Sequence, residues 1–273
     1  QDEIRQAAKA LAFELDVKGL MNVQFAVKGT AIYILEVNPR ASRTVPFVSK
    51  AVGVQLAKIA ARVMVGERLV DLGFTDEVIP DHMAVKNPVF PFHKFPGCDI
   101  ILGPEMRSTG ESMGIDLSIG AAFLKAHISA GNDLPLEGLV FISVKDADKR
   151  DIVALAHRLD GLGLGLVATE GTCKILERNG IPATSVKKIA EGRPNITDYM
   201  KNSEIRLVIN TPSGMGPRTD EADIRGLAVS QGIPCITTLA GAATAISAIE
   251  AASKGGIGVT PLQRYHERLA ARL

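Results

Sequence analysis

The sequence GLVATEGTCKILERN, residues 165–179, decides the fold of the carboxyl-terminal half of the chain. Its first five residues form an apolar run that suits a buried strand, and the residues from Thr172 onward have a helical pattern. Thr169 and Thr172 offer hydroxyls at the junction, and Gly171 between them allows close approach to the backbone. Because a helix N-terminus attracts anions, the stretch predicts a strand, a phosphate-binding turn and a helix.

Strand and helix patterns alternate on both sides of this stretch. Such alternation is typical of a parallel, doubly wound α/β sheet, in which ligands bind outside the carboxyl ends of the strands. The expected strands are Leu139 to Val144, Gly165 to Thr169, Thr184 to Val186, Leu207 to Asn210 and Cys235 to Thr237. The expected helices are Ala147 to Leu159, Thr172 to Asn179, Ile196 to Lys201, Glu221 to Gln231 and Ala242 to Ala251.

Polar side chains follow several of these strands. Lys149 comes after the first, Lys188 after the third, and Asn210 with Thr211 at the end of the fourth. Since the strands are expected to be parallel, these residues can converge with the threonines at 169 and 172 on one anion. Each signal is weak alone, because a threonine before a helix is usually an N-cap.

A second informative stretch is ILEVNPR, residues 34–40. Glu36 and Asn38 are two positions apart in a strand pattern, so their side chains share a face. Gln24 lies on the preceding strand, and the Lys28-Gly29 turn folds the two strands into a hairpin. Three oxygen ligands suit Mg²⁺ or Mn²⁺. Arg40 just beyond suits a phosphoryl oxygen that the metal also contacts.

The rest of the amino-terminal half mixes helices with short strands. We expect a helix from Glu3 to Leu15, and two helices between Val45 and Val65 that are interrupted by Gly53. The stretch Ser129 to Gly138 is rich in turn residues and is the best linker candidate. The predicted domains are therefore residues 1–131 and 132–273.

Composition excludes several classes of function. Lys+Arg 31 against Asp+Glu 30 gives a net charge of +1, the basic residues are scattered along the chain, and tryptophan is absent, so we expect no nucleic-acid partner. The three cysteines form no CxxC pair, which predicts reduced thiols and a cytoplasmic location. No signal peptide or membrane-spanning run occurs, so no membrane partner is expected. The chain lacks an initiator methionine, and we expect it to be a fragment.

Three long motifs carry a resemblance to a known family. They are EVNPRASRTVPFVSKAVGVQLAKIAARVMVGERL (residues 36–69), FPGCDIILGPEMRSTGESMG (residues 95–114) and EGRPNITDYMKN (residues 191–202). In collinear order they resemble the large subunit of carbamoyl phosphate synthetase. The resemblance implies a partial ATP-grasp (α+β) unit, followed by a methylglyoxal-synthase-like allosteric domain with a doubly wound parallel sheet.

The resemblance also implies an activity and its partners. The activity is phosphorylation of carbamate by ATP to give carbamoyl phosphate for arginine and pyrimidine synthesis, in a glutamine-hydrolysing ligase of which this fragment alone is inactive. Gln24 and Glu36 would contact ATP through the metal, and Arg40 would be catalytic. The partners would be a small glutaminase subunit, further copies in a higher oligomer of heterodimers, and a nucleotide monophosphate. The effector-binding positions would be Lys149, Thr169, Thr172, Lys188, Asn210 and Thr211.

Two departures and two rival functions stay open. Asn87 stands where the family commonly has a glutamate that takes part in ornithine activation, and Pro212 stands where some relatives have a hydroxyl. Activation by ornithine, and the choice between UMP and IMP, are therefore open. One rival is a regulatory nucleotide-binding module without catalysis. The other is a methylglyoxal-synthase-type lyase, which is disfavoured because no histidine lies between Arg158 and Tyr265.

Overall fold

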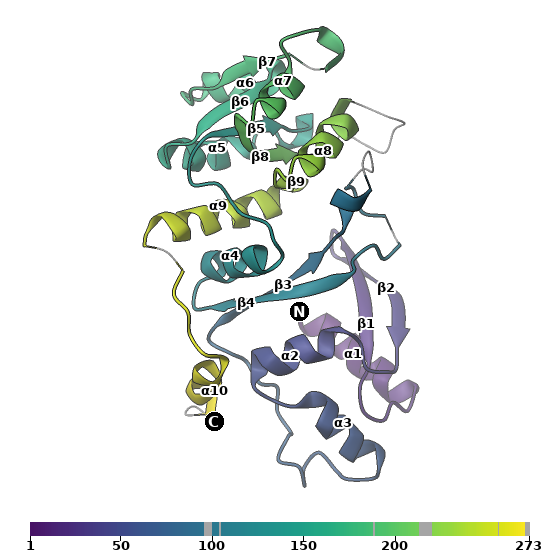
Figure 1. The fold of residues 1–273 in the computed structure, drawn as a ribbon. Helices are drawn as coiled ribbons and strands as arrows, with labels where there is room; N and C mark the ends of the chain where they lie inside the picture. Colours follow the sequence, from purple (N-terminus) through teal and green to yellow (C-terminus); the bar gives the residue numbers. More distant parts are fainter. Residues whose placement is uncertain (96–99, 104, 188, 213–219, 256, 271–273) are drawn as a thin grey trace. The chain divides into compact units, whose positions relative to one another are not determined.

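The chain forms two compact units. A computed structural model describes residues 1–95, 100–103, 105–187, 189–212, 220–255 and 257–270 (Figure 1). One unit comprises Gln1–Asp81 with Val259–Leu273, and the other comprises His82–Gly258. The boundaries of these compact units differ from the domain boundary that we expect between residues 131 and 132. That domain boundary stays a prediction.

The first unit pairs helices with one hairpin. Its elements are α1 (Asp2–Glu14), β1 (Asn22–Lys28), β2 (Ala31–Asn38), α2 (Thr44–Val52), α3 (Leu56–Met64) and α10 (Leu262–Ala270). The predicted interruption at Gly53 is confirmed: this residue has a φ of 72° and separates α2 from α3. A ring nitrogen of His266 on α10 lies 2.7 Å from the carbonyl oxygen of Lys50 on α2. The carboxyl-terminal helix is therefore joined to this unit.

The hairpin has an irregular register. β1 and β2 are antiparallel, with Gln24 opposite Glu36 and Phe25 opposite Ile34. Leu35 is thus an extra residue in β2, as in a β-bulge. Beyond the bulge, Asn22 lies opposite Asn38 at the open end of the hairpin.

Few side chains of the first unit are buried. Among the described residues of this unit, the buried hydrophobic ones are Ala51, Ala60, Tyr265 and Leu269. Large apolar side chains remain exposed, including Phe13 at 85% and Leu35 at 65%. The hydrophobic side chains of this unit therefore form little core of their own.

The second unit contains the predicted parallel sheet. Its strands are β5 (Leu139–Ser143), β6 (Gly165–Thr169), β7 (Thr184–Val186), β8 (Ile205–Asn210) and β9 (Cys235–Ile236). All neighbours are parallel, in the order β7-β6-β5-β8-β9. The strand order reverses beside β5, so the carboxyl ends of β5 and β8 flank the switch point at which such sheets bind ligands.

Helices cover both faces of the sheet. They are α5 (Ile152–Gly161), α6 (Glu170–Arg178), α7 (Ile196–Lys201), α8 (Asp220–Ser230) and α9 (Leu239–Ser253), with 3₁₀ turns at Asp146–Asp148 and Ile189–Glu191. Val140 and Ile142 pack in one core with α5, α6 and α9, and Phe141 packs in a second core with α7 and α8. Because strand residues alternate between faces, one short strand contributes to both cores.

An antiparallel ribbon and a helix complete the second unit. β3 (Met83–Val89), a 3₁₀ turn (Phe92–Lys94), β4 (Gly110–Asp116) and α4 (Ile119–Ser129) precede the sheet, and Figure 1 shows α4 between the ribbon and α9. A Cβ atom on Gly114 would lie 1.8 Å from the carbonyl oxygen of Ala122, and one on Gly120 would lie 2.3 Å from that of Ser247. Glycine therefore permits close contact on both sides of α4.

The segment expected to be a linker is mostly exposed, but it is attached to the sheet. Leu134 is only 8% exposed and belongs to the core cluster beneath α9. The carbonyl of Gly138 accepts a hydrogen bond from the backbone N–H of Gly165 at 3.1 Å. This part of the chain is therefore anchored at two points.

Within the described ranges, none of the helices has the length and apolar character that crossing a bilayer requires.

Candidate functional site

The open end of the β1–β2 hairpin gathers three of the predicted site residues. The side-chain amide of Asn38 donates to Glu36 Oε1 at 2.8 Å. Arg40 donates from Nη2 to Asn38 Oδ1 at 3.3 Å and from Nη1 to the carbonyl of Ala41 at 3.2 Å. The carboxylate, the amide and the guanidinium thus form one connected group at the surface.

Gln24 belongs to the same face of the hairpin. Directly opposed residues of an antiparallel pair project from the same face, and Gln24 is paired with Glu36. The predicted ligand set therefore consists of one carboxylate and two amides. Such oxygen donors fit a hard cation like Mg²⁺ or Mn²⁺. The described residues contain no group of three or more His, Cys, Asp and Glu side chains with metal-binding geometry, so amide oxygens would have to complete the set.

The turn between β6 and α6 holds the predicted phosphate-binding residues. Thr169 is the N-cap of α6, and its Oγ1 lies 3.4 Å from Oγ1 of Thr172. Lys149 reaches the same turn from the segment after β5, because its Nζ lies 3.0 Å from the position of a Cβ atom on Gly171. This ammonium also pairs with Asp146 Oδ1 at 2.6 Å. One ammonium and two hydroxyls therefore gather where α6 begins.

Asn210 and Thr211 point into the protein. Their exposed fractions are 0% and 2%. The side-chain amide of Asn210 donates to the carbonyl of Ser143 at 3.1 Å, and Thr211 Oγ1 accepts from the backbone N–H of Lys145 at 3.1 Å. Both residues join the carboxyl ends of β8 and β5. The sequence placed them correctly at the sheet edge, but their polar groups are already bonded to the backbone at and just after the end of β5 and, for Asn210, to a side chain of α8. Lys188 lies outside the described residues.

An ion pair within the motif at residues 191–202 orders the segment after β7, and this pair was not expected from the sequence. Arg193 donates from Nε to Asp198 Oδ1 at 3.0 Å, and Asp198 Oδ2 accepts from the backbone N–H of Asn195 at 2.9 Å. The Arg193 hydrogen bond, followed by that from Asn195, lowers the pKa of Asp198 to about 2. Asn195 and Asp198 form a capping box on α7. The spacing N-x-x-D could have revealed this cap.

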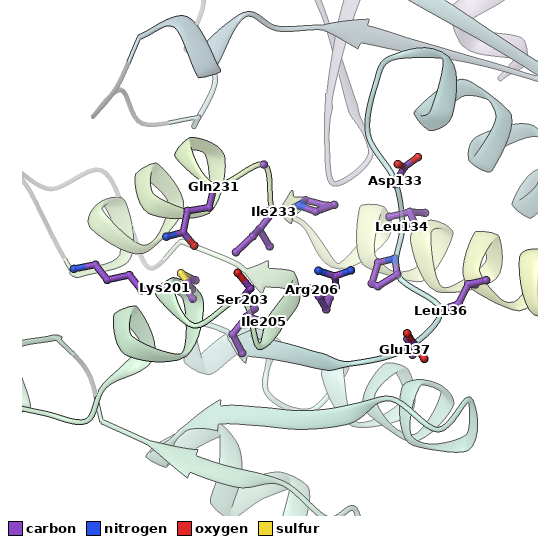
Figure 2. Close-up of a pocket in the computed structure, with 14 residues that line it drawn as sticks. Asp133, Leu134, Leu136, Glu137, Lys201, Ser203, Ile205, Arg206, Gln231 and Ile233 are labelled. Carbon is purple, nitrogen blue, oxygen red and sulfur yellow. The ribbon is translucent and has the colours of Figure 1, made fainter.

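The opposite edge of the sheet has a cavity of about 880 Å³. Figure 2 shows Arg206 near its middle, with Lys201, Ser203 and Gln231 on one side and Asp133 and Glu137 on the other. Its lining residues come from the carboxyl ends of α7 and α8, from the chain at and before the amino-terminal ends of β8 and β9, and from the segment at residues 133–137. The cavity is therefore separate from the predicted effector residues, which lie at the carboxyl ends.

Two family models match this chain. Residues 1–72 match the carbamoyl-phosphate synthase L chain, ATP binding domain, and residues 151–237 match the MGS-like domain. The hairpin with Glu36 lies in the first match and the β6–α6 turn lies in the second. These matches define the class: a segment of an ATP-binding domain joined to an MGS-like domain.

Curated relatives show the family. The carbamoyl phosphate synthase large chain of Rhodopirellula baltica is 53% identical over 97% of this chain and 25% of its own length. That of Methanosarcina barkeri is 47% identical over 98% of this chain and 68% of its own length. The chain belongs to the carbamoyl phosphate synthase large-chain family. It spans about a quarter of the length of the Rhodopirellula relative.

Solved structures are similar to part of the chain. A methylglyoxal synthase from Elizabethkingia anophelis covers 42% of the chain with 22% identity and a TM-score of 0.36. This likeness is too low to support an argument about the site.

Proposed function

We propose that this chain supplies the metal- and phosphate-binding hairpin of an ATP-dependent ligase that phosphorylates carbamate to carbamoyl phosphate. The observation that carries the proposal is the connected group of Glu36, Asn38 and Arg40, with Gln24 opposite. Family membership indicates the reaction, because the relatives are carbamoyl phosphate synthase large chains.

Each group has a distinct role in this proposal. Glu36, Asn38 and Gln24 would hold Mg²⁺ or Mn²⁺, which neutralises the charge of the ATP phosphates when bound. Arg40 would bind a phosphoryl oxygen, since a planar guanidinium offers two donors to one phosphate. Its present hydrogen bond to Asn38 keeps this guanidinium beside the ligand set.

We propose that the carboxyl edge of the sheet binds a nucleotide monophosphate effector. Lys149, Thr169 and Thr172 would contact the phosphate, with Lys188 as a further cation. Asn210 and Thr211 are buried, so their contribution would be to shape the edge. Whether UMP or IMP binds depends on contacts beyond the phosphate, and Asn87 leaves ornithine activation open.

Membership of the family also suggests partners for this chain. A small glutaminase subunit would supply ammonia, the complex would form a higher oligomer of heterodimers, and the cytoplasmic location predicted from the cysteines stays a prediction.

A regulatory nucleotide-binding module without catalysis is a second candidate for the isolated chain. The observation favouring it is the small core of the unit that carries Glu36. We expect the isolated chain to be inactive in either case.

The test of catalysis is Glu36→Gln in a full-length large chain that contains these residues. The substitution removes the one anionic ligand, so ATP synthesis from carbamoyl phosphate and ADP at saturating Mg²⁺ should fall by about a hundredfold or more. Glu14→Gln, at an exposed position near the end of α1, is the matched control and should leave the rate unchanged. Wild-type rates in Glu36→Gln would refute the metal assignment.

A further inference from the structure

Arg225 is a cation inside the second unit. It lies on α8, and only 2% of its surface is exposed. Its Nη1 donates to Asn210 Oδ1 at 2.7 Å and lies 4.0 Å from Glu221 Oε2. A buried charge is costly unless it is bonded, so these two partners are needed to hold the guanidinium inside the protein.

The hydrogen bond from Arg225 fixes the orientation of the Asn210 amide. With Oδ1 accepting from Arg225, Nδ2 is directed to the carbonyl of Ser143, the last residue of β5. The same carbonyl accepts the backbone N–H of Thr211 at 3.1 Å. An amide has one acceptor and one donor group, and both are used here. A rotated amide would lose both bonds.

These bonds determine where two strands end relative to each other. Thr211 in turn accepts the backbone N–H of Lys145 through Oγ1, so the chain of hydrogen bonds runs from α8 through β8 to the segment after β5. Lys149, which lies four residues after Lys145, reaches over Gly171 into the phosphate-binding turn. The position of this lysine segment therefore depends on contacts that begin at Arg225.

We propose that Arg225 is a positioning residue for the effector site. It holds Asn210, and through Asn210 it fixes the ends of β8 and β5 at the edge where the nucleotide monophosphate binds. Arg225 does not contact the nucleotide itself. The inference rests on the proposed effector function, and it adds a residue on α8 to the residues on which that function depends.

The experiment combines amide exchange with nucleotide titration in the 273-residue chain. Arg225→Gln should speed hydrogen exchange of the Lys145 and Thr211 amides without ligand. It should also weaken the binding of UMP or IMP, at most by about 10–100-fold, because the lost charged hydrogen bond joins Arg225 to Asn210 and only the part of its free energy that positions the site reaches the nucleotide. Arg206→Gln is the matched control, because Arg206 lies on β8, the strand that ends in Asn210, but at the opposite end of this strand beside the cavity. It should change neither measurement.

A double variant separates positioning from general destabilisation. If Arg225 acts through Asn210, then Arg225→Gln combined with Asn210→Ala should bind nucleotide no more weakly than Asn210→Ala alone. Arg225→Lys keeps the charge and a donor, should recover part of the affinity, and carries the test if the glutamine variant fails to fold.

Three results would contradict the inference. They are unchanged amide exchange in Arg225→Gln, faster exchange with unchanged nucleotide affinity, and additive effects of the two substitutions. If neither UMP nor IMP binds the wild-type chain, the effector function itself fails. The exchange measurement still decides in that case whether Arg225 positions the strand ends.

Discussion

The two units differ in how the surrounding structure supports their candidate site residues. In the first unit, Glu36 lies on a two-stranded hairpin and Arg40 follows it directly. Leu35, next to Glu36 in the same strand, is 65% exposed. In the second, Thr169 and Asn210 end strands whose interiors are almost fully buried. An isolated two-stranded hairpin is marginal in water, whereas a sheet covered on both faces supports itself. Packing therefore fixes the carboxyl ends of β6 and β8, while the hairpin has no buried side chain among its described strand residues.

The largest expected effect tests whether stability resides in the second unit. Leu207→Ala removes a fully buried side chain from β8 and should lower the free energy of unfolding by about 2–5 kcal/mol. Leu35→Ala, on the exposed hairpin, should change it by less than about 0.5 kcal/mol. Urea unfolding followed by circular dichroism measures both, since the chain has no tryptophan. Similar losses in both variants would remove the contrast between the units.

A smaller effect sharpens the contrast at a helix contact. Gly120→Ala places a Cβ atom 2.3 Å from the carbonyl oxygen of Ser247 and should cost about 1–3 kcal/mol, because α4 must move away from α9. Gly161→Ala, at the end of α5, has no atom within 4 Å of the new group. It should be neutral or stabilise by up to about 1 kcal/mol through lower backbone entropy of the unfolded chain. A tolerated Gly120→Ala in thermal unfolding would show that α4 and α9 are loosely packed.

The smallest effect concerns pH. The pKa of Asp198 is lowered in the folded chain to about 2, so its stabilisation is present above the unfolded value of about 3.9 and is lost as pH falls through about 2. Asp198→Asn keeps an acceptor for Asn195 but removes the charge, and should flatten stability between pH 4 and 2. Asp160→Asn, at an exposed position on α5, is the control. The comparison requires unfolding curves across this pH range, and an identical pH dependence in Asp198→Asn would contradict the ion-pair assignment.

Local patterns in the sequence predicted most of the elements in both units. The strand Gly165–Thr169 was predicted with its observed bounds, and Gly53 predicted the division between α2 and α3. These features depend on neighbours in the chain, namely an apolar run and a residue that adopts positive φ. The contact between Glu36 and Asn38 was predictable for the same reason, since these residues are two positions apart in a strand, whereas their role as metal ligands stays a prediction.

Features that depend on distant contacts were missed. The local sequence pattern does not reveal β4, and it reveals β3 only as a strand-like piece from Met83 to Val85; Pro88, within the observed strand, is a residue that argues against a strand. A two-stranded ribbon tolerates proline, since an unpaired edge requires no N–H donor. Arg225 was missed because an arginine in a helix is usually solvated. Its role depends on Asn210, which follows from the packing of α8 and not from any local pattern.

The contact between α4 and α9 has a consequence for the order in which the chain folds. The β3–β4 ribbon and α4 are synthesised early, but Gly120 packs against Ser247, which emerges only after every strand of the parallel sheet has been made. Contacts between residues so far apart in sequence close late, because the intervening loop loses entropy first. We therefore expect the apolar face of α4 that packs against α9 to remain uncovered during translation, and accessible to chaperones, until α9 has been synthesised.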